Sequence, residues 1–194
     1  MTKKKIGSQL TEWYEKSHNF NKKYSNPSYE NIGIAHVFRG ILLGGSGSGK
    51  SRVLLEIIYR LQDTFGKIIL CTQDKSEPLY EYLKSKIEEN LIIHEGYNKI
   101  PTLEETNEKY KKEQVLIIFD DMVGEKKQDK IIEYFVRGRK ACHGVSCLYL
   151  SQSYFQTPKL IRLQLSFLVM KKLTSTRDLN FILSDFNLGV DRYI

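Results

Sequence analysis

The chain has 194 residues, with 30 Lys and Arg against 23 Asp and Glu, which leaves a formal net charge of +7 at pH 7. Hydrophobic residues make up 41% of the chain, and Gly (13) and Pro (4) are few. This balance excludes a disordered, collagen-like or fibrous chain and favours one globular domain able to bury a full core.

Residues 1–30 are polar, rich in Lys and dotted with aromatic side chains, which predicts a basic N-terminal arm with one short helix near residues 10–16. Residues 31–194 are expected to form the single folded domain. No apolar run follows Lys3, Lys4 and Lys5, so we expect no secretion signal. No apolar stretch approaches the roughly 18 residues that span a bilayer.

Basic side chains outnumber acidic ones in residues 122–140 and 159–194 as well as in the arm, whereas residues 81–113 are acidic. A surface with separate basic and acidic regions can steer nucleic acid to one side, although ordinary solvated faces explain this charge distribution equally well. Cys71 and Cys147 lie in apolar runs and are expected to be buried thiols. The four His and three Cys residues have no zinc-ligand spacing.

From residue 32 onward, predicted strands and helices alternate. Short apolar runs predict strands near 40–43, 68–71, 91–93, 115–119, 145–150 and 166–170. Helical spacing or capping signals predict helices near 50–61, 76–87, 102–112, 131–136 and 175–186, with a helical turn after Pro158. The capping signals are Ser76 with Pro78, Thr102 with Glu105, and Ser175 with Asp178. Apolar strands interleaved with helices predict a parallel sheet covered on both faces, an α/β sandwich and not a barrel.

The motif G-x-x-x-x-G-K-[ST] lies between the first predicted strand and the first helix, which is the context that a phosphate-binding loop requires. Its backbone N–H groups and the helix N-terminus are expected to cradle phosphates. We expect Lys50 to reach the β- and γ-phosphates and the Ser51 hydroxyl to ligate Mg²⁺. The nucleotide-binding residues are therefore Gly44, Gly45, Ser46, Gly47, Ser48, Gly49, Lys50 and Ser51.

Polar side chains follow two apolar strands, at the edge where ligands gather in a parallel sheet. Asp120 suits the Mg²⁺ shell, and Asp121 is placed to orient or deprotonate the attacking water, although both carboxylates can instead cap the next turn. Gln152 can donate to a γ-phosphate or hold a water, the alternative being an ordinary surface residue.

Arginines near residue 138 are candidates for a side chain that acts on a neighbouring subunit's nucleotide. Arg139 is preferred over Arg137, with Arg162 as a third candidate. A solvated basic helix end explains the same residues equally well.

The motif set resembles the viral DNA-packaging ATPases of the FtsK–HerA superfamily. It consists of the phosphate loop, Phe119-Asp120-Asp121, Arg137 to Lys140, and Leu150 to Phe155. The resemblance is strongest to the poxvirus-type branch of large DNA viruses, virophages and polinton-like elements, and runs from about Gly40 to Gly189.

This resemblance implies a RecA-like (ASCE) P-loop core, a three-layer α/β sandwich with a mainly parallel sheet and the Gln-bearing strand between the phosphate-loop and acidic-pair strands. It implies ATP and Mg²⁺ as cofactors, and a homo-oligomeric ring, pentamer or hexamer, that drives double-stranded DNA into a preformed capsid. Implied partners are a capsid vertex or membrane-associated packaging components, in the host cytoplasm or the virion.

Carried over residue by residue, Lys50 and Ser51 bind nucleotide and Mg²⁺, Asp120 and Asp121 are the metal and water carboxylates, Gln152 is the sensor and Arg139 acts across the interface. The superfamily often has Asp-Glu where this chain has Asp-Asp. Because Asp is one methylene shorter than Glu, the position of the attacking water should shift, and hydrolysis by the isolated protein is expected to be slow.

Two other functions fit a chain of this size. A small nucleotide or small-molecule kinase needs an Arg-rich lid, and no such segment stands out. A nucleotide-gated assembly adaptor without translocation would not need the intact Lys50, Asp121 and Gln152.

Overall fold

The computed structural model describes residues 24–173 and 175–186, so the helix predicted near residues 10–16 lies outside the described part. Six strands form one parallel sheet in the order β3-β2-β4-β5-β1-β6. The strands are β1 (Arg39–Leu43), β2 (Lys67–Thr72), β3 (Leu91–Glu95), β4 (Val115–Asp120), β5 (Val145–Ser151) and β6 (Phe167–Met170). All six predicted strands are confirmed, and β5 lies between β1 and β4 as the resemblance implies.

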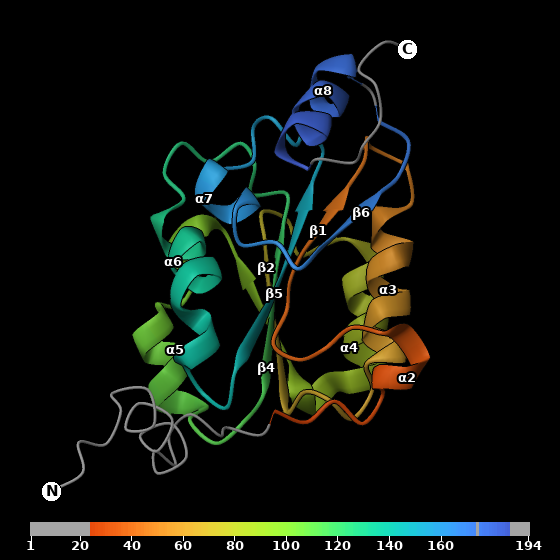
Figure 1. Cartoon of the computed structure of the whole chain (residues 1–194). Coiled ribbons are helices and arrows are strands. Elements are labelled where there is room, and N and C mark those ends of the chain that lie inside the picture. The colour runs from red at the N-terminus through yellow and green to blue at the C-terminus, as the bar shows by residue number, and fades with distance from the viewer. Residues whose placement is uncertain (1–23, 174, 187–194) are drawn as a thin grey trace, which may run out of the picture.

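Helices cover both faces of this sheet (Figure 1). One layer holds α2 (Tyr29–Ile32), α3 (Lys50–Arg60) and α4 (Pro78–Ile87). The other holds α5 (Leu103–Lys109), α6 (Asp129–Arg137) and α7 (Lys159–Arg162), while α8 (Thr176–Asp185) lies near the carboxyl ends of β1 and β5. Short 3₁₀ turns are η1 (Glu88–Asn90), η2 (Tyr97–Lys99) and η3 (Gly138–Lys140). The predicted three-layer, RecA-like α/β sandwich is confirmed.

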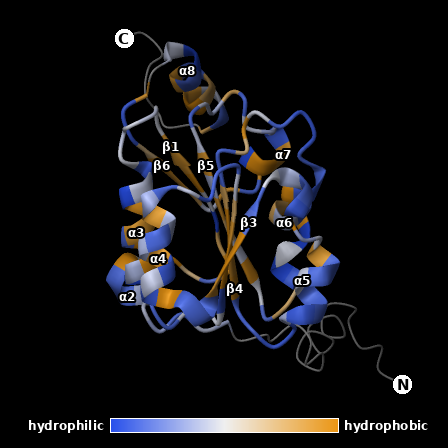
Figure 2. Cartoon of the chain, turned by 180° about the vertical axis from the view of Figure 1, so that it is seen from behind, coloured by the Kyte–Doolittle hydropathy of each residue, from blue (hydrophilic) through white to orange (hydrophobic). Residues whose placement is uncertain are grey.

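The central strand β4 shows why the sheet needs two helical layers. Its six residues are all buried. Leu116 and Ile118 pack in the core beneath α3 and α4, whereas Val115, Ile117 and Phe119 pack against α5 and α6 on the other face. Successive side chains of a strand point to opposite faces, so an all-apolar strand requires cover on both sides. Figure 2 shows the apolar strands between helices whose outer surfaces are hydrophilic.

Two of the three predicted capping signals need correction. The capping box of Thr102 and Glu105 is present at the start of α5. At α4 the N-cap is Glu77, not Ser76, and Pro78 is the first helical residue. At α8 the Ser175 side chain does accept a hydrogen bond from the Arg177 N–H, but Asp178 is buried and accepts from residues of another loop instead.

The described end of the N-terminal arm contacts the domain. The Tyr24 hydroxyl donates to the Arg139 carbonyl, and the Ser28 hydroxyl donates to the Gln62 carbonyl. The boundary at residue 30 stays a prediction. The three cysteines are buried and form no disulfide. Across residues 24–173 and 175–186, no helix combines the length and the hydropathy needed to cross a membrane.

Candidate functional site

The phosphate loop joins the end of β1 to the start of α3, as the motif predicts. Gly47 (φ 67°) and Gly49 (φ 89°) adopt left-handed conformations that side-chain-bearing residues rarely accept, and they allow the tight turn. The Gly44 N–H donates to the Ser151 carbonyl, which fixes the loop to the end of β5. The Ser48 Oγ is buried without a hydrogen-bond partner among the described residues.

Lys50 is the first residue of α3, and its ammonium folds back over the loop. It donates to the Gly44 carbonyl (2.8 Å) and the Gly45 carbonyl (3.0 Å). Burial lowers the pKa of Lys50, and the negative charges of Asp120, Asp121 and Glu77 offset part of that effect. The ammonium therefore has acidic groups near it, but no carboxylate forms a salt bridge with it among the described residues.

The two carboxylates at the end of β4 have different environments. Asp120 is the last residue of the strand and is only 9% exposed, and burial raises its pKa. Asp121 is exposed, with a left-handed backbone (φ 55°) that Asp tolerates better than most residues. The sharp turn between them lets the two adjacent carboxylates reach the same cleft from different directions.

A cleft of about 470 Å³ brings together seven of the predicted site residues. It is lined by Ser46, Gly47, Lys50 and Ser51 from the loop, Asp120 at the end of β4 with the following Asp121, and Gln152 from the turn after β5. Strand order explains this meeting, because β1, β5 and β4 are neighbours and parallel strands present their carboxyl ends at one edge. The assigned roles remain proposals.

Glu77 and Tyr80 are among the residues of the cleft that were not predicted as site residues. The Ser51 hydroxyl lies 3.5 Å from the Glu77 carboxylate, at hydrogen-bond limit. The Tyr80 hydroxyl donates to Asp120 Oδ2 at 2.5 Å, and burial raises the pKa of Tyr80, so the phenol stays protonated. No local sequence pattern marks these two residues, because they reach the cleft only through the pairing of β2 with β4.

The cleft fits a nucleotide with a hard divalent cation. The groups beside Lys50 are a hydroxyl (Ser51) and carboxylates (Asp120, Asp121, Glu77), an all-oxygen set that suits Mg²⁺. The unpartnered Ser48 hydroxyl and the loop's backbone N–H groups at the N-terminus of α3 provide donors for phosphate oxygens.

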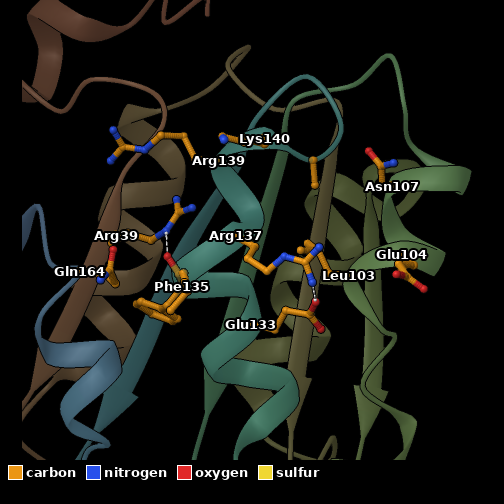
Figure 3. A pocket seen from close by; sticks show the side chains of 12 residues that line it. Arg39, Leu103, Glu104, Asn107, Glu133, Phe135, Arg137, Arg139, Lys140 and Gln164 are labelled. Carbon is orange, nitrogen blue, oxygen red and sulfur yellow. Dashed lines mark hydrogen bonds and ion pairs between the residues drawn. The ribbon is translucent and has the colours of Figure 1, made fainter.

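The candidate arginines lie elsewhere. Arg137 and Arg139 border a second cavity of about 540 Å³, lined also by Arg39, the first residue of β1. The phosphate loop follows the last residue of β1, so this cavity lies at the opposite end of the sheet. Figure 3 shows Arg137 paired with Glu133 on its own helix (2.6 Å), while Arg139 extends on the side where Arg39 lies.

Arg162, the third candidate, is already engaged. It pairs with Asp185 of α8 and stacks over Tyr154, with its guanidinium carbon 5.0 Å from the ring centroid. Of the three candidates, Arg139 is therefore the one without an ion pair among the described residues.

Helix α8 holds the turn that carries Gln152. Asp178 accepts from the Ser153 hydroxyl (3.0 Å) and from the Phe155 N–H (2.8 Å), and Phe155 packs on Phe181 of the same helix. The prediction that Asp178 caps α8 is wrong, because its partner Ser153 lies 25 residues away in the chain.

A family model described as "Poxvirus A32 protein" matches residues 28–193. No curated protein matches the sequence.

Several solved structures share the fold. The genome packaging NTPase B204 from Sulfolobus turreted icosahedral virus 2, in complex with AMPPCP, is 16% identical with a TM-score of 0.61, over 79% of this chain and 84% of that one. The DNA-packaging ATPase B204 from Sulfolobus turreted icosahedral virus is 13% identical with a TM-score of 0.57, over 87% and 91%. EssC (ATPases 2 and 3) from Geobacillus thermodenitrificans is 11% identical with a TM-score of 0.58, over 81% of this chain but 35% of EssC.

Proposed function

Because the chain belongs to the poxvirus A32 protein family, we propose that it is an ATP-hydrolysing motor that translocates double-stranded viral DNA into a preformed capsid. The structurally similar B204 proteins are described as a genome packaging NTPase and a DNA-packaging ATPase. The observation that carries the proposal is the meeting of Lys50, Asp120 and Gln152 in one cleft from three separate segments of the chain.

The cleft residues divide the work of hydrolysis. The loop N–H groups bind the phosphates, and the Lys50 ammonium, released from the Gly44 and Gly45 carbonyls, neutralises charge on the β- and γ-phosphates. Ser51 and Asp120 would hold Mg²⁺, which stabilises negative charge on the phosphate oxygens when bound. Complexes of B204 with AMPPCP and with ATPγS support the choice of ATP as the nucleotide.

The exposed carboxylate of Asp121 orients the attacking water and accepts its proton. The Gln152 amide, on the neighbouring strand end, donates to the γ-phosphate or to that water. A missing γ-phosphate removes this partner, and α8 is attached to the same turn through Asp178. Gln152 thereby senses the nucleotide state next to a helix that can transmit it.

Arg139 completes the site in a neighbouring subunit of a homo-oligomeric ring. A strand of five residues is about 16 Å long, so Arg139, at the amino end of the sheet, does not reach the cleft of its own chain. A guanidinium that enters a neighbour's cleft neutralises charge in the transition state. The partners in this proposal are duplex DNA and a capsid vertex or membrane-associated packaging component, in the host cytoplasm or the virion.

The test is ATP turnover by the assembled ring with and without duplex DNA. We expect DNA to stimulate turnover, and we expect DNA affinity to fall steeply with salt, because phosphate contacts release counterions. Turnover that DNA does not change, in a ring shown to be intact, would contradict the motor. Phosphoryl transfer to a nucleoside monophosphate would indicate a kinase instead, and packaging that survives Asp121→Ala would indicate an assembly adaptor.

A further inference from the structure

Helix α4 brings a buried phenol to the metal-side carboxylate of the cleft. Tyr80 is 1% exposed, and its hydroxyl donates to Asp120 Oδ2 at 2.5 Å. Within the described part of the chain, no other hydrogen bond reaches the Asp120 side chain. Asp120 therefore has one oxygen engaged by Tyr80 and one oxygen, Oδ1, left for a ligand in the cleft.

The support behind Tyr80 is rigid. Its ring packs in the core with Leu70 of β2 and Leu83 of α4, and its backbone N–H donates to the Glu77 carbonyl (2.8 Å) in the first turn of the helix. A side chain locked by packing holds a functional group more accurately than one on a mobile loop. The hydroxyl of Tyr80 is thus a fixed donor at the end of β4.

The carboxylate needs such a donor. Rotation of an Asp carboxyl group about its last torsion is broad, so an unanchored carboxylate must be ordered when it binds a cation. A hydrogen bond to one oxygen removes part of that freedom before the ligand arrives. Partners of this kind orient metal ligands, and their loss typically costs about 10- to 100-fold in metal affinity or activity.

We propose that Tyr80 is a positioning residue, whose hydroxyl fixes the Asp120 carboxylate so that Oδ1 is available to the metal ion that accompanies the nucleotide. The inference rests on the proposed function, because it needs a Mg-nucleotide in this cleft. It gives α4, which carries none of the sequence motifs, a direct part in the site.

The test replaces only the hydroxyl, with Tyr80→Phe. The affinity of the ADP complex for Mn²⁺, measured by electron paramagnetic resonance of free Mn²⁺, should fall about 10- to 100-fold. The affinity for ADP without metal should stay within about twofold. The matched control is Tyr134→Phe, which removes an equally buried hydroxyl that is bonded to Thr106 and does not line the cleft.

A double-mutant cycle with Asp120→Asn separates positioning from a general loss of packing. If Tyr80 acts through Asp120, Tyr80→Phe should change Mn²⁺ affinity little once Asp120 is replaced. Equal losses in both backgrounds, an unchanged Mn²⁺ affinity in Tyr80→Phe, or the same loss in Tyr134→Phe would each overturn the inference. If instead the unaltered protein binds no Mg-nucleotide, the proposed function itself fails, and this inference fails with it.

Discussion

Replacing Lys50 by Met keeps the aliphatic stem in place and removes only the ammonium. At about 4 Å and an effective dielectric constant of about 20, attraction between that ammonium and one phosphate charge is about 4 kcal/mol. Nucleotide binding also breaks the two hydrogen bonds to the Gly44 and Gly45 carbonyls, which at about 1 kcal/mol each offsets about 2 kcal/mol. The net loss is about 2 kcal/mol, or roughly thirtyfold weaker binding. Uncompensated repulsion from the neighbouring carboxylates adds to this loss.

The assay is isothermal titration of the purified protein with Mg-ADP, with urea unfolding to show that the variant folds. The matched control is Lys171→Met, because Lys171 is exposed, carries the same charge and lies beside Gly49 of the loop. We expect the control to bind within about threefold of the unaltered protein. If Lys50→Met binds as well as the control, the phosphate contact assigned to Lys50 does not exist.

Three further outcomes are expected. Asp121→Asn should bind Mg-ATP normally and lose ATP turnover. If its steady-state turnover equals that of the unaltered protein, Asp121 is not the base. Arg139→Ala should spare nucleotide affinity and abolish turnover by the ring; mixing it with Lys50→Met subunits should restore part of the turnover, and no recovery in mixed rings would contradict action across the interface. Burial lowers the pKa of His36 from 6.5 to about 4. The unfolded chain therefore takes up a proton at His36 as the pH falls below about 6.5, while the folded protein does not, so stability decreases with acidity in that range. From pH 7 to pH 5 the unaltered protein should lose about 2 kcal/mol more unfolding free energy than His36→Asn, in which the amide can replace the bond to Ser146. If the unaltered protein and His36→Asn give parallel curves of unfolding free energy against pH, the pKa of His36 is not lowered.

The sequence by itself determined the elements and the phosphate loop. Strands such as Val115–Asp120 are apolar without interruption, and helices such as Asp129–Arg137 have one apolar face, so hydrophobic periodicity reports them directly. The loop from Gly44 to Ser51 is contiguous in the chain, so its residues are close whatever the rest of the fold does. Asp120 and Gln152 were placed at strand ends by the same local pattern.

Only the tertiary structure decided what surrounds those residues. Glu77 and Tyr80 reach the cleft because β2 pairs with β4. Asp178 bonds to the turn after β5, and not to the start of its own helix, because α8 packs on that turn. Arg139 lies at the far end of the sheet from the loop of its own chain. Such contacts join residues tens of positions apart, and their free energy comes from packing whole layers together, which no local pattern records.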